Sequence, residues 1–140
     1  MANEEKIAHL GFIQGVINRM GNNSFLIKGW VVTLVAAIFA LSAEKANIKF
    51  AYVAFFPLIF FWWLDAFFLH QEKLYRKLYE KVADETEPSS QFSMNAGKYN
   101  KEVDCLFKVF FSKTLRYFYV PIGVLLIIFM WKIIDLIKIP

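Results

Sequence analysis

Three long apolar stretches constrain this chain more than any other feature. They cover approximately residues 25–42, 48–69 and 115–137, and hydrophobic side chains dominate each of them. A helix of 18 residues is about 27 Å long, close to the roughly 30 Å hydrocarbon core of a bilayer. A soluble domain of 140 residues could not bury three helices that are apolar all round. The sequence therefore predicts an all-α integral membrane protein, a bundle with three transmembrane helices.

The composition agrees with a membrane domain. Hydrophobic residues make up 58% of the chain, whereas soluble domains contain about 45–50%. The length predicts one membrane domain, residues 1–140, with no separate catalytic domain. The net charge is +4, but the basic residues lie beside the apolar stretches, where they orient a membrane protein. We therefore expect membrane lipid, and no nucleic acid, among the partners.

The polar segments complete the predicted architecture. Residues 4–20 carry apolar side chains at three-to-four spacing and predict an N-terminal amphipathic helix. Gly21 and the two asparagines after it are expected to end that helix, with Ser24 capping the first span. The helical pattern of the second span continues into residue 84, which predicts a long second helix projecting into the cytoplasm. The whole region 70–114 is expected to be cytoplasmic and helical.

Small residues indicate where helices approach one another. Gly11 and Gly15 form a small-xxx-small pair, and Ala36 and Ala40 lie on a stripe of small residues in the first span. Such stripes let helix backbones come close in membranes, so both predict helix packing and a homo-oligomer. Pro57 lies in the middle of the second span and predicts a kink.

The positions of Lys and Arg predict the orientation. Twelve of the 16 lie before residue 29 or between residues 70 and 116, and four lie in the other two polar segments. The positive-inside rule then places the N-terminus and the region 70–114 in the cytoplasm, in a bacterial inner membrane. Three crossings put the C-terminus outside. Alternatively, the third stretch enters the membrane and returns, which leaves the C-terminus cytoplasmic.

Residues for catalysis are scarce. The sequence holds two histidines and one cysteine, and it lacks HExxH, a P-loop, GxGxxG and GxSxG. We therefore predict no catalytic, cofactor or metal site and no enzyme. The notable polar residue is Asp65, which aromatic side chains flank inside the second span. A carboxylate there is expected to pair with Arg19 or Lys28. Alternatively, it is an interfacial aspartate that ends the span.

One sequence block suggests a family. Residues 9–34 read HLxxIQxVIxRMxxNSFxxKGWxVTL, and later elements include Trp63-Leu64-Asp65, Leu78-Tyr79-Glu80 and Phe92-Ser93-Met94. This pattern resembles an uncharacterised family of small bacterial three-span membrane proteins. An amphipathic helix that leads through Asn-Ser-Phe into a span is also remotely similar to the RipA-type octameric membrane proteins. That resemblance implies homo-oligomerisation but no activity.

Three functions fit these features. The first is a non-enzymatic homo-oligomer of the bacterial inner membrane that forms a pore or perturbs the membrane. The second is a membrane adaptor that binds a soluble cytoplasmic partner through residues 70–114. The third is a small membrane enzyme, which the missing motifs disfavour. Few strongly polar residues lie in any span, so a wide pore that is always open is not expected.

Overall fold

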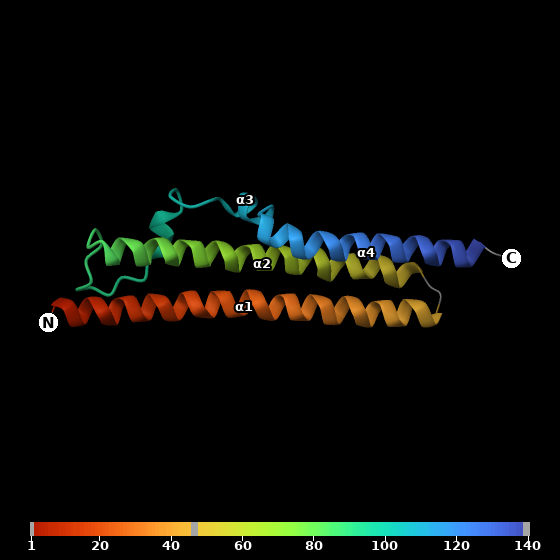
Figure 1. The fold of residues 1–140 in the computed structure, drawn as a ribbon, viewed down its shortest axis with the longest axis horizontal. Coiled ribbons are helices and arrows are strands. Elements are labelled where there is room, and N and C mark those ends of the chain that lie inside the picture. The colour runs from red at the N-terminus through yellow and green to blue at the C-terminus, as the bar shows by residue number, and fades with distance from the viewer. Residues whose placement is uncertain (1, 46–47, 139–140) are drawn as a thin grey trace. The chain divides into compact units, whose positions relative to one another are not determined.

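The computed structural model of the protein describes residues 2–45 and 48–138, and most of these residues are helical. The elements are α1 (Ala2–Lys45), α2 (Ile48–Ala83), the short 3₁₀ helix η1 (Ala96–Tyr99), α3 (Leu106–Phe110) and α4 (Lys113–Lys138) (Figure 1). Three of these helices, α1, α2 and α4, are long and apolar enough to cross a membrane. The prediction of an all-α chain with three candidate spans is confirmed. The polar break between the first two spans falls partly on residues 46 and 47, which lie outside the described residues.

The break predicted after residue 20 is wrong, because α1 continues from Ala2 to Lys45 without interruption. Glycine and asparagine cost a helix at most about 1 kcal/mol per residue. Buried residues at the same helical spacing lie on both sides of them, Ile13 and Ile17 before and Ile27 and Val31 after. Packing along this face outweighs the weak local propensity.

Helix α2 also runs further than its apolar part. It continues as helix through Pro57 and ends at Ala83. A long second helix is therefore present, while its projection into the cytoplasm and the bend at Pro57 remain predictions. Asp84 and Glu85 still bond to carbonyls of the last turn, and Glu85 has a positive φ of 59°. That left-handed residue turns the chain away from the helix axis.

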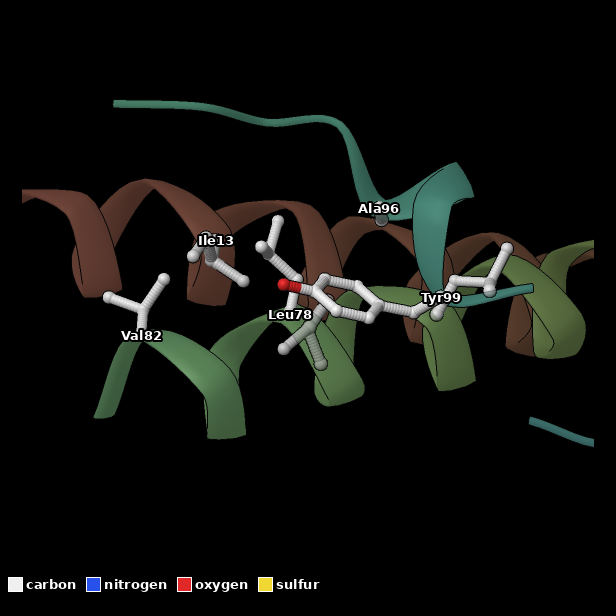
Figure 2. Close-up of a cluster of buried hydrophobic side chains, with 7 residues drawn as sticks. Ile13, Leu78, Val82, Ala96 and Tyr99 are labelled. Atoms are coloured by element: carbon white, nitrogen blue, oxygen red, sulfur yellow. The ribbon is translucent and has the colours of Figure 1, made fainter. Parts of the chain in front are cut away.

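The chain forms two compact units. The first contains residues 1–25 and 66–109. Its halves of α1 and α2 are antiparallel, since Lys6 contacts the end of α2 while Gly21 lies beside Glu72. Figure 2 shows Ile13 of α1 near Leu78 and Val82 of α2. The buried core of this unit also includes Ile17, Leu74, Ala96 and Tyr99.

The second unit contains residues 26–65 and 110–140, and so the apolar parts of all three long helices. Its buried apolar residues recur at helical spacing and are Ile27, Val31, Val35, Ala54, Leu58, Leu115, Tyr119, Leu126 and Ile133. The Phe39 and Phe129 rings of α1 and α4 stack at 4.4 Å, and Gly123 of α4 lies beside Leu58 of α2. This unit is thus a three-helix bundle with an apolar core.

Candidate functional site

A charged side chain lies inside the second unit. Asp65 of α2 is fully buried, at 0% exposure. Its Oδ2 atom lies 2.5 Å from Lys28 Nζ of α1. The Tyr119 hydroxyl of α4 donates to the same oxygen at 3.0 Å. We call these three residues the Asp65 cluster. Each comes from a different long helix, so the cluster joins α1, α2 and α4 at one level.

Lys28 bridges two helices at once. Its side chain is 22% exposed, and its ammonium group also lies 5.9 Å from the centroid of the Phe118 ring on α4. An ammonium at this distance from an aromatic face is attracted to the ring. A buried carboxylate costs several kcal/mol unless it is paired and hydrogen-bonded. Lys28 and Tyr119 meet both requirements for Asp65.

Aromatic rings cover one side of the cluster. The Trp62 ring stacks on Tyr119 at 5.3 Å and on Phe110 at 4.7 Å. Its indole nitrogen also donates to the Phe110 carbonyl at 2.9 Å. These contacts exclude water beside Tyr119 and strengthen its hydrogen bond to the carboxylate. They also place the segment before α4 at the level of Trp62 on α2.

The structure selects between the two partners predicted for Asp65. Lys28 contacts the carboxylate, whereas Arg19 is an exposed residue of the first unit. Full burial favours the buried pair over the interfacial aspartate. Sequence reasoning missed Tyr119, an amphipathic aromatic near the start of the third predicted span, and the specific role of Trp62, one of the aromatic residues that flank Asp65. Because a carboxylate, an ammonium group and a phenol satisfy one another here, the cluster is arranged to hold helices together.

The small residues predicted for packing are exposed within the single chain. Nothing outside the local helix lies within 4 Å of a Cβ added at Gly11 or Gly15. Ala36 and Ala40 are also exposed, and Ala36 lines a shallow apolar depression beside Phe39 and Ile122. We call Gly11, Gly15, Ala36 and Ala40 the small-residue positions of α1. Their packing against another helix remains a prediction.

A second polar site, which sequence reasoning also missed, lies in the first unit. His9 is fully buried, and its Nε2 lies 3.0 Å from the Ser93 carbonyl. A carbonyl can only accept, so this nitrogen carries the proton. The ring also packs edge-on against Phe92, whose φ is 47°. Together with Lys6, which donates to the Ala83 carbonyl at 2.7 Å, His9 holds the segment after α2 against α1.

Ion pairs hold the rest of that segment. Lys73 and Lys108 both contact Asp104, at 2.8 and 2.5 Å. Hydrogen bonds from Lys108 and then Lys73 lower the pKa of the Asp104 carboxyl to about 2. Lys98 and Tyr99 likewise hydrogen-bond to Glu87 and lower the pKa of its carboxyl. The Lys73–Asp104 pair holds the residues before α3 to α2, and the Glu87 contacts hold η1 to the turn that follows α2.

Neither site has the form of a metal centre. Among residues 2–45 and 48–138, no group of three or more His, Cys, Asp or Glu side chains gathers to hold an ion. Cys105 is exposed and free. No family model, curated protein or solved structure matches the chain.

Proposed function

We propose that this protein is a small, non-enzymatic homo-oligomer of the bacterial inner membrane whose assembly perturbs the membrane or opens a pore through it. The observation that carries the proposal is the exposure of the small-residue positions of α1. Three helices enclose no conduit of their own, so a path across the membrane requires several copies. The Asp65 cluster holds each copy together, and the outer face of α1 is left for contact between copies.

The burial within one chain supports this proposal. Within the most apolar window of each candidate span, the buried share of residues is 17%, 22% and 17% for α1, α2 and α4. The remaining surface faces lipid or another protein. Lipid covers large side chains well, whereas glycine and alanine favour a close helix neighbour because backbones then gain direct van der Waals contact. A second copy of α1 is such a neighbour.

Basic residues support the orientation that belongs to this proposal. The first unit contains most of the Lys and Arg, many of them in ion pairs along residues 73–108. Clusters of these residues stay on the cytoplasmic side of bacterial membranes. The proposed topology therefore has the N-terminus inside, three crossings and the C-terminus outside.

The decisive experiment measures the mass of the assembly. Gly15→Leu and Ala40→Leu place a large side chain on the proposed interface, and nothing outside the local helix lies within 4 Å of a Cβ at residue 15. Overpacking an interface costs about 1–3 kcal/mol, so each variant is expected to weaken assembly about tenfold or more in native mass spectrometry. Leucine is a better helix former than glycine, so the helix content of the Gly15→Leu monomer should not fall.

A matched control adds bulk elsewhere. Val124→Phe adds as many side-chain heavy atoms to an exposed residue of α4 as Gly15→Leu adds to α1, and it is expected to leave the oligomer intact. A wild-type protein that is monomeric in several mild detergents would exclude the assembly. Ion flux into liposomes that contain wild-type oligomers, absent with Ala40→Leu, would support a pore; a wild-type oligomer without flux would favour a perturbing or structural role.

The adaptor is the second candidate, and exposed apolar residues of the first unit favour it. Ile7 and Phe12 of α1 are 63% and 59% exposed, and Phe12 contacts Phe92 of the following segment. Exposed apolar patches outside a membrane mark protein-binding surfaces. A photo-crosslinker at Phe12 should then capture one defined soluble protein in cells, and a crosslinker at Lys101 should not. Capture of the chain itself at both positions would argue against an adaptor.

A further inference from the structure

An apolar groove lies on the surface of the second unit. Its lining consists of Phe56, Ile59, Phe60 and Trp63 of α2 together with Phe110, and its volume is about 500 Å³. Every lining side chain is hydrophobic, and Phe56 is 75% exposed. From residue 56 to residue 63 the helix rises about 10 Å. The groove is therefore an open, elongated apolar surface along α2.

One end of the groove is fixed next to the start of α4. The Trp62 indole bonds to the Phe110 carbonyl and stacks on its ring, which places Phe110 beside the Trp62–Trp63 end. The opposite end, at Phe56, lies closer to the middle of the apolar stretch of α2. A molecule in this groove would thus have one end near Phe110 and the other deeper along the span.

Two cations follow Phe110 within six residues of the chain. Lys113 follows Phe110 by three residues, so their Cα atoms are at most about 11 Å apart. Arg116 and Tyr117 lie three and four residues further along α4, on the same helix face as Lys113. All three side chains are exposed. Within the described ranges no ion pair involves Lys113 or Arg116, and the sequence holds no Asp or Glu between residues 105 and 134.

We propose that this surface binds an anionic glycerophospholipid, with the phosphate between Lys113 and Arg116 and one acyl chain in the groove. The charges are complementary, and the N-terminus of a long helix adds partial positive charge at the same place. Tyr117 is 78% exposed, and a tyrosine beside the cations suits the headgroup level. The groove then continues inward along the direction that an acyl chain takes. The inference requires membrane insertion but not the oligomer.

The fluorescence of Trp63, which lines the groove, reports directly on a lipid chain bound there. The protein is reconstituted in phosphatidylcholine vesicles with a low mole fraction of brominated-chain phosphatidylglycerol or, separately, brominated-chain phosphatidylcholine. Bromine quenches a tryptophan only on contact. Equal quenching of the wild-type fluorescence should require a several-fold lower mole fraction of the phosphatidylglycerol than of the phosphatidylcholine. Trp63→Phe should remove most of this difference between the lipids, although Trp30, Trp62 and Trp131 remain.

Charge variants locate the headgroup. Lys113→Gln/Arg116→Gln is expected to lower the preference for phosphatidylglycerol by about fivefold for each cation. The matched control Arg19→Gln/Lys101→Gln removes the same charge from exposed residues of the first unit and should leave the preference unchanged. The exchange Lys113→Arg/Arg116→Lys keeps both charges and should keep the preference for phosphatidylglycerol. It therefore distinguishes a loss of charge from a loss of folding as the cause of any effect.

Three results would overturn the proposal. The first is equal quenching of the wild type by both lipids. The second is an equal loss of preference in the control, because that would indicate general attraction to the surface. The third is a preference that survives the Trp63→Phe change undiminished, because the chain would then lie outside the groove.

Discussion

The Asp65 cluster makes a quantitative prediction about stability. Asp65 is fully buried and Lys28 is 22% exposed, so most of their interaction is shielded from water. Removing one partner from a buried pair costs about 3–5 kcal/mol because the other charge is left uncompensated. For Lys28→Gln we expect about 3 kcal/mol, since Tyr119 still donates to the carboxylate. For Asp65→Asn we expect about 2 kcal/mol, because Lys28 can reach water.

The double variant distinguishes coupling from two separate losses. Asn and Gln together leave no buried charge and can hydrogen-bond, so Asp65→Asn/Lys28→Gln should cost about 2 kcal/mol in total. Independent effects would add to about 5 kcal/mol. The difference from the double variant is a coupling free energy of about 3 kcal/mol. Unfolding in mixed micelles with a rising mole fraction of sodium dodecyl sulfate, followed by circular dichroism, gives the free energies.

A solvated pair provides the control. Lys6 and Glu85 lie 2.9 Å apart, but the Glu85 side chain is 78% exposed. Water and salt screen such a pair, so the cycle with Lys6→Gln and Glu85→Gln should show a much smaller coupling. If the losses at Asp65 and Lys28 simply added, the reasoning would be refuted. The contact would then have no energetic weight, and Asp65 would only mark the end of a span.

Three further predictions follow from other contacts. Tyr119→Phe should cost about 2 kcal/mol in the same assay, because it removes a hydrogen bond to a charge; no loss would mean that the bond is not formed. Since the pKa of Asp104 is lowered to about 2, the ionised carboxylate should stabilise the first unit above about pH 4, and this stabilisation should disappear toward pH 2. Hydrogen-exchange protection of the first unit should fall over the same pH range, and Asp104→Asn should remove that pH-dependent fall. Finally, cysteines introduced one at a time into a variant that lacks Cys105 test the topology. A cysteine at residue 80 should react with a thiol reagent on the cytoplasmic side, and a cysteine at residue 140 should react with a reagent added outside.

The helical class and the spans were predictable because they depend on local pattern. Long apolar runs have few alternatives in a chain of this size. The helical pattern predicted to continue into residue 84 matches α2, which ends at Ala83 and buries Leu74, Leu78 and Val82. The end of a helix is less predictable. Gly21 and its asparagine neighbours are weak helix formers, but the buried face that includes Ile17 before them and Ile27 after them favours a continuous α1.

The partners in the sites depended on tertiary structure. From the sequence, Arg19 and Lys28 were equal candidates for Asp65, since both were assigned to the same side of the membrane. The rotation of α1 and α2 about their axes decided for Lys28, and helix α4 brought in Tyr119 from 54 residues away. His9 bonds to Ser93 across 84 residues in the same way. Residue type and spacing describe one helix at a time, whereas a buried charge is satisfied by whichever side chains neighbouring helices place within about 3 Å of it.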